Sequence, residues 1–196
     1  MENENFSFKI KVLRAYYISN GLEYLVSIPY YHFTQDGNVA LDGQDEVGRF
    51  SFSGKASGDY IYLEKKYHGK HTVYYAGKLD GAHLHLHYDF QGDYDNLITK
   101  IKSGDYNGGV VFDAQLYNLH FDGKVIPVFL AVDEDDAKLK LKGLGIIDNK
   151  AYKLVLEKSS SDLGKLKLKQ GDDERTLNIR ISGYDLYVDG RWTYSF

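Results

Sequence analysis

The chain contains no cysteine, two prolines, one methionine and one tryptophan among its 196 residues. The lack of cysteine excludes disulfide bonds, thiolate metal sites and cysteine nucleophiles. No apolar run approaches the roughly 18–20 residues that a membrane-spanning helix needs, so we expect no helical membrane span. The first residues, Met1 to Asn5, are acidic and polar and do not resemble a signal peptide. We therefore expect a cytoplasmic protein, with secretion as the alternative if a leader has been removed.

Concentrated positive charge and the common catalytic motifs are also missing. The formal net charge is −4, with an isoelectric point near 6.0. Nucleic-acid binding requires a concentrated basic face, so we expect no nucleic-acid partner. The sequence contains no Gly-x-Ser-x-Gly, no phosphate-binding loop, no dinucleotide fingerprint and no His-Glu-x-x-His. These absences favour a protein that is not an enzyme and needs no cofactor, although a Ser-His-Asp triad assembled across strands stays open.

Tyrosine, phenylalanine and glycine are abundant, with 18, 10 and 20 residues respectively. Aromatic residues suit half-buried strands, and glycine suits the turns between them. Apolar and polar residues alternate in Phe6 to Val12, Arg49 to Ser53, Ala82 to His87, Lys138 to Lys142, Lys165 to Lys169 and Leu177 to Ile181. Turn-forming pairs occur at Asn20-Gly21, Asp36-Gly37, Asp42-Gly43, Asp80-Gly81, Asp122-Gly123 and Asp189-Gly190. We predict an all-β protein of about ten to twelve strands, mostly joined as hairpins.

The two halves of the chain resemble each other. Asp45 to Gly54 and Glu134 to Gly143 both contain an acidic turn, a basic residue and alternating apolar residues before a glycine. Further on, Tyr62 to Lys65 resembles Val155 to Lys158. We interpret residues 1–196 as a single β domain with related halves, 1–90 and 109–196, joined by a connector at 91–108 that contains a helical turn or two. An antiparallel meander barrel is the first choice, and a two-sheet sandwich or two small related barrels is the alternative.

One stretch resembles the meander hairpins of calycin-type barrels, the architecture of lipocalins and avidins. The resemblance covers Gly48-x-Phe50-x-Phe52-x-Gly54, Tyr60 to Tyr67 and His71-x-Val73-x-Tyr75-x-Gly77. It implies a barrel with a lumen and implies no particular ligand. The sequence departs from lipocalins, which have an N-terminal Gly-x-Trp, because the one tryptophan here is Trp192. It departs from avidins because biotin pockets use several tryptophans.

Three histidines, His83, His85 and His87, alternate with Leu84 and Leu86. The alternation places the three imidazoles on one face of a strand and the leucines on the other. Such a face could provide two ligands to a divalent metal, although a third ligand would have to come from elsewhere. The alternatives are a solvated outer face, which we favour, and a ligand-contacting or pH-sensing role.

The register of the surrounding hairpins follows from two assumed turns. If Asp80-Gly81 is a two-residue turn and residues 68–70 form a three-residue loop, Leu84 and Leu86 lie opposite Gly77 and Tyr75. Ile61 and Leu63 then share the same inward face. Near that loop, His68 and His71 lie beside Lys65, Lys66 and Lys70, which we interpret as an exposed basic loop.

Aromatic clusters at strand ends supply the candidate ligand-binding residues, because aromatic faces stack on sugar rings and fill pockets. These candidates are Tyr30, Tyr31, His32, Trp192 and Tyr194. We expect a non-enzymatic binding protein for a small apolar or aromatic ligand or a carbohydrate, held in a barrel lumen or at its aromatic rim. The alternatives are a metal-dependent enzyme centred on the histidines and a structural or interaction protein with a filled barrel. The oligomeric state stays open.

Overall fold

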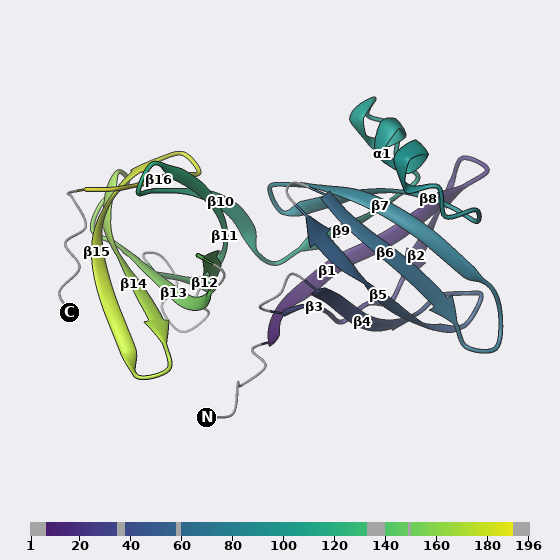
Figure 1. The fold of residues 1–196 in the computed structure, drawn as a ribbon, viewed down its shortest axis with the longest axis horizontal. Coiled ribbons are helices and arrows are strands. Elements are labelled where there is room, and N and C mark those ends of the chain that lie inside the picture. The colour runs from purple at the N-terminus through teal and green to yellow at the C-terminus, as the bar shows by residue number, and fades with distance from the viewer. Residues whose placement is uncertain (1–6, 35–37, 58–59, 133–139, 149, 190–196) are drawn as a thin grey trace. The chain divides into compact units, whose positions relative to one another are not determined.

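The computed structural model describes residues 7–34, 38–57, 60–132, 140–148 and 150–189. These residues form sixteen strands and one helix. The chain divides into two compact units, Met1–Asp113 and Ala114–Phe196, and each unit contains its own closed barrel (Figure 1). The prediction of an all-β barrel protein is confirmed. The number of strands exceeds the prediction, and the chain forms two barrels, which was the alternative to a single barrel.

The first unit contains β1 (Ser7–Ser19), β2 (Leu22–Val26), β3 (Tyr30–Thr34), β4 (Asn38–Gln44), β5 (Arg49–Ser57), β6 (Tyr60–Tyr67), β7 (Thr72–Asp80), β8 (His83–Asp89), α1 (Tyr94–Lys102) and β9 (Gly108–Phe112). Its barrel is antiparallel and has eight strands, in the order β1-β3-β4-β5-β6-β7-β8-β9. The long strand β1 pairs with β3 and then β2 along one edge, and with β9 along the other. A bulge between Val12 and Arg14 adjusts the pairing with β9. This architecture is compatible with a calycin-like barrel.

Several predicted turns are present. Asn20 and Gly21 join β1 to β2, and Asp122 and Gly123 join β10 to β11, all with positive φ angles as tight hairpin turns require. The β7–β8 turn lies one residue later than predicted, at Gly81 and Ala82, because Asp80 pairs with His83. The Asp36-Gly37 turn and Gly190 lie outside the described residues.

The turn predicted at Asp42-Gly43 is wrong, because both residues belong to strand β4. Gly43 serves packing there, not chain reversal. A Cβ atom at Gly43 would lie 2.5 Å from the Phe50 ring and 2.7 Å from the backbone oxygen of Ser27. A glycine is therefore required at this position of the strand, because the Phe50 ring and the Ser27 backbone lie close to it.

The inward face of β6, β7 and β8 agrees with the predicted alternation. Leu84 and Leu86 are buried in the first barrel, and Ile61 and Leu63 lie on the same face. Because the turn is displaced, Leu86 lies opposite Gly77, and Tyr75 lies opposite Tyr88. This displacement changes the pairing by two residues, so each side chain keeps its predicted face.

Helix α1 lies outside the first barrel against β7 and β8 (Figure 1). Asp93 caps its first turn by accepting a hydrogen bond from the backbone N–H of Asn96. Leu97 and Ile101 are its buried residues. The predicted connector, residues 91–108, therefore contains a helix and lies within the first unit, and the chain divides at Asp113. Among the described residues, no helix has the length and apolar character needed to cross a membrane.

The second unit contains β10 (Gln115–Phe121), β11 (Lys124–Val132), β12 (Lys140–Ile147), β13 (Lys150–Lys158), β14 (Leu163–Gln170), β15 (Asp173–Ser182) and β16 (Asp185–Val188). These strands close a seven-stranded barrel in which β10 and β16 run parallel. Leu119, Val128, Leu156, Leu166 and Leu186 are fully buried in its core. The core of this barrel is therefore mostly aliphatic.

Candidate functional site at one end of the first barrel

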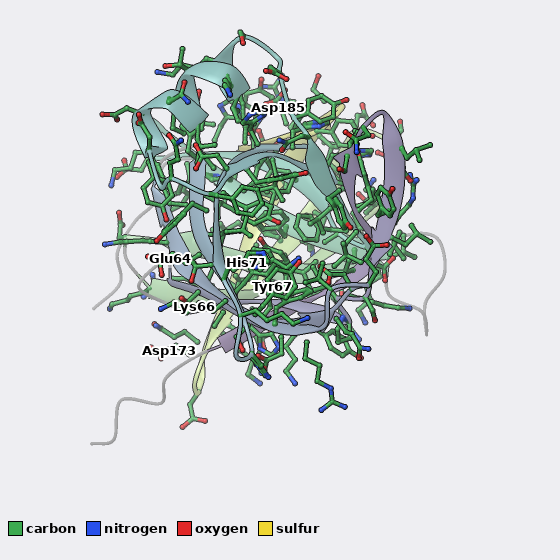
Figure 2. The ribbon with its side chains drawn as sticks, turned by 90° about the vertical axis from the view of Figure 1, so that its right-hand side faces the viewer. Glu64, Lys66, Tyr67, His71, Asp173 and Asp185 are labelled. Carbon is green, nitrogen blue, oxygen red and sulfur yellow. The ribbon has the colours of Figure 1, made fainter. Side chains whose placement is uncertain are left out.

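The alternation of strand β6 carries a lysine into the core of the first barrel. Ile61, Leu63, Lys65 and Tyr67 all point inward, and the Lys65 side chain is 2% exposed. Lys66 lies on the outer face, where its ammonium group is 3.3 Å from Glu64 (Figure 2). The prediction of an exposed basic loop is therefore wrong for Lys65. The sequence did indicate this inward position, because the period of two in a strand places Lys65 on the same face as Ile61 and Leu63.

The buried ammonium group is neutralised by an acidic residue from the turn between β4 and β5. Lys65 Nζ donates to Asp45 Oδ2 at 2.5 Å and to the Tyr67 hydroxyl at 2.7 Å. The Tyr67 hydroxyl in turn donates to Asp45 Oδ2 at 2.5 Å. The Asp45 side chain is completely buried. A buried charge pair of this kind is tolerated only when its polar atoms are hydrogen-bonded, as they are here.

Aromatic rings surround the same ammonium group. Lys65 Nζ lies 4.0 Å from the centre of the Phe50 ring, 4.5 Å from that of Tyr67 and 5.8 Å from that of Phe52. These distances are those of cation–π interactions. Burial lowers the pKa of Lys65, and the hydrogen bond and negative charge of Asp45 oppose that effect. Burial alone would raise the pKa of Asp45, but hydrogen bonds from Lys65 and Tyr67 outweigh it and hold that pKa below its usual range.

The turn that carries Asp45 is fixed from several sides. Asp45 Oδ1 accepts hydrogen bonds from the backbone N–H groups of Val47 and Gly48, at 2.9 and 3.3 Å. Lys70 Nζ donates to the Val47 carbonyl oxygen at 2.5 Å. The Tyr17 hydroxyl on β1 donates to Glu46 Oε1 at 2.6 Å. The turn is thus attached to β1, to β6 and to the loop after β6.

The interior next to this cluster is almost completely filled. A cavity of about 20 Å³ lies among side chains that include Tyr17, Phe52, Lys65 and Tyr75. A cavity of this size holds about one water molecule. It is far below the roughly 300–1,000 Å³ of small-molecule sites. This cavity therefore has no room for a small organic ligand without rearrangement.

Two open grooves lie outside, on either side of a backbone bridge between Ser27 and Gln44. The bridge consists of two hydrogen bonds, Ser27 N–H to Gln44 O at 2.8 Å and Gln44 N–H to Ser27 O at 3.0 Å. We call the first groove the edge groove; it has about 480 Å³ and is lined by Leu25, Val26, Ser27, Gln44, Asp45 and Glu46. We call the second the polar groove; it has about 440 Å³ and is lined by Ser27, Pro29, Asp42, Gly43, Gln44, Arg49, Phe50 and His68.

The three histidines of β8 point away from the lumen, in the direction predicted, but they do not share one environment. His83 is exposed, and the rings of His83 and His85 are 6.0 Å apart. His87 is buried, and its Nδ1 atom has no hydrogen-bond partner among the described residues. Burial and the charge of Lys100 on α1 lower the pKa of His87, and Asp105 opposes them. In the described part of the chain, no group of three or more histidine, aspartate or glutamate residues is placed to hold a metal ion.

The predicted aromatic candidates lie on different faces of β3. Tyr31 is 1% exposed, and its ring contacts Phe112 edge-on at 5.2 Å, so it is a core residue. Tyr30 is 45% exposed and lies near Lys9, whose ammonium group is 5.6 Å from the ring centre. His32 is half-buried. Trp192 and Tyr194 lie outside the described residues, so their part in a ligand-binding rim remains a prediction.

Comparisons of this chain with models of known protein families, with curated proteins and with solved structures found no match.

Proposed function

We propose that this chain is a non-enzymatic binding protein and that it binds a carbohydrate in the polar groove at the end of the first barrel. The filled interior carries this proposal. A cavity of about 20 Å³ leaves no space for a sugar or an apolar ligand in the lumen, whereas the polar groove of about 440 Å³ has the size of a ligand site. The site therefore lies outside the barrel, where the strand ends supply polar side chains.

The chemistry of the groove suits a polyhydroxylated ligand, because each sugar hydroxyl can both donate and accept. Asp42 supplies an acceptor, Arg49 supplies only donors and Gln44 supplies both. Among the described residues, no acidic side chain forms an ion pair with Arg49, so its guanidinium group is available to a ligand. Asp42 Oδ1 accepts a hydrogen bond from Ser51 Oγ at 2.7 Å, which orients the carboxylate. The Ser51 hydroxyl also lies 3.3 Å from His68 Nε2.

A structural or interaction protein is the second candidate. The same filled interior supports it, because aliphatic side chains also occupy the core of the second barrel. A protein of this kind would bind no small molecule at all.

A glycan array, followed by titration of the best glycan with ligand-observed NMR, distinguishes these two candidates. Loss of one charged hydrogen bond costs about 1.5–3 kcal/mol, which corresponds to ~10- to 150-fold weaker binding. We expect Asp42→Asn and Arg49→Gln each to weaken binding within that range. Asp172→Asn, an exposed change of the same kind in the second unit, provides the control and should leave affinity unchanged. Silence across the array, or equal affinity in all three variants, would refute the proposal and favour the interaction protein.

A further inference from the structure

Strand β2 forms an edge of the first unit's sheet. It forms an antiparallel ladder with β1, which runs from Ser19 opposite Leu22 to Ala15 opposite Val26. Along its other side, no strand in the described part of the chain pairs with Leu22 to Val26. Such an edge presents unpaired backbone groups, and natural proteins usually cover or block it.

The tight turn before β2 determines which backbone groups face outward. Asn20 and Gly21 have φ angles of 51° and 73°, as in a two-residue hairpin whose flanking pair, Ser19 and Leu22, is hydrogen-bonded. Hydrogen-bonded and non-hydrogen-bonded pairs alternate along an antiparallel ladder. Tyr24 therefore directs its N–H and C=O toward β1, whereas Glu23 and Leu25 direct theirs away from it.

A ladder on this outer side begins and then stops. Ser27 exchanges two hydrogen bonds with Gln44, the last residue of β4, in antiparallel orientation. Beyond Gln44 the chain reverses, because Asp45 and Gly48 hydrogen-bond to each other through their backbones. Leu25 is the next residue along this edge. The edge groove of about 480 Å³ lies between Leu25 and the turn that carries Asp45 and Glu46.

We propose that this groove binds an extended segment of another protein, which adds to the sheet as a strand antiparallel to β2. The backbone of that segment continues the ladder that Ser27 and Gln44 begin, and its N–H and C=O groups pair with those of Leu25 and Glu23. This is recognition by β-strand addition. The inference is independent of carbohydrate binding in the polar groove.

The side chains around the groove define the chemistry of the segment. Leu25 is 70% exposed, so the residue opposite it is apolar. The next residue points to the other face, where Tyr24 stacks on Tyr17 at 5.0 Å and the Tyr17 hydroxyl donates to Glu46. Because Glu46 is exposed and acidic, a lysine or arginine at that position complements its charge.

The test uses a capped heptapeptide of alternating valine and lysine and follows the backbone amides of the full chain by NMR. We expect the Glu23 and Leu25 amides to shift and to exchange with solvent about tenfold more slowly when the peptide is bound. A peptide of the same sequence that is N-methylated along one backbone edge keeps its charge and loses the ladder, so it should not bind.

Two variants sharpen the result. Leu25→Pro removes an N–H that points away from β1, which an edge strand tolerates, and it should abolish binding. Leu25→Ala keeps that N–H and should retain binding. Equal binding of the N-methylated peptide, or binding that leaves the Glu23 and Leu25 amides unchanged, would overturn the proposal even if Leu25→Pro does not fold.

Discussion

The buried pair of Lys65 and Asp45 leads to a quantitative prediction about the first unit. Removing one partner of a buried charge pair leaves the other charge without compensation, which costs about 3–5 kcal/mol. We expect this loss for Lys65→Met and for Asp45→Asn, because both side chains are 2% exposed or less. The double variant leaves no buried net charge, so its loss should be smaller than the sum of the single losses by more than ~2 kcal/mol.

The assay has to follow the first unit alone, because two units can unfold separately. Urea unfolding monitored by the methyl NMR signals of Ile61 and Leu63, both buried in the first barrel, meets this need. With a urea m-value of about 2 kcal/mol/M, a loss of 4 kcal/mol lowers the midpoint by about 2 M.

The neighbouring residue provides a matched control. Lys66 forms an exposed pair with Glu64, with side chains 64% and 40% exposed, so Lys66→Met should cost less than about 1 kcal/mol. The reasoning is refuted if Lys65→Met costs no more than Lys66→Met, or if the two single losses simply add.

Three further predictions concern pH and backbone packing. The pKa of Asp45 is lower in the folded chain than its ordinary 3.8, so the stability that this carboxylate provides is present above about pH 4 and is lost as the pH falls further. Acid unfolding of Asp45→Asn should lack this contribution to the loss of stability. The pKa of His87 is held below its ordinary 6.5, so protonation disfavours the folded form. The protection factors of the α1 amides, which compare each exchange rate with that of an unfolded chain at the same pH, should therefore fall as the pH drops below about 6.5 in the natural chain but not in His87→Gln. A Cβ atom at Gly54 would lie 1.8 Å from the Tyr62 carbonyl oxygen, so Gly54→Ala should cost more than ~3 kcal/mol in urea unfolding. The control is Gly21→Asn, at a φ of 73° with open space around it, which should cost less than ~1 kcal/mol.

The outcomes that would contradict these predictions are distinct. An unchanged acid profile in Asp45→Asn would show that other carboxylates dominate acid unfolding. Equal pH dependence of α1 exchange in His87→Gln would assign the effect to another group. A stable Gly54→Ala variant would show that β5 and β6 can separate locally.

Local alternation predicted the inward faces of the apolar residues in β6 and β8, although the number of strands was underestimated. The leucines of β8 and the apolar residues of β6 point inward because a strand has a period of two, whatever its neighbours are. The position of the β7–β8 turn was one residue off, since Gly81 and Ala82 form it and Asp80 belongs to the strand. An error of one residue at the turn changed the pairing without changing any face.

Long-range contacts could not be predicted in the same way. Gly43 has the sequence context of a turn. Its close contact with Phe50, its partner on the neighbouring strand β5, explains why a glycine lies within a strand here. Helix α1 covers His87, and nothing in the alternation of β8 indicates that cover. The inward position of Lys65 was available from strand phase, but its partner Asp45 lies in a different hairpin and becomes apparent only in three dimensions.

The pairing of β1 with β9 has a consequence for the order of events during synthesis. Val12 belongs to the first strand of this barrel, and its partner Phe112 belongs to the last. One edge of β1 therefore remains open on the ribosome until Phe112 has left the exit tunnel, and closing so long a loop is slow. During that interval the nascent chain exposes an incomplete sheet to other chains, so chaperone binding to the nascent first unit should persist until this strand emerges.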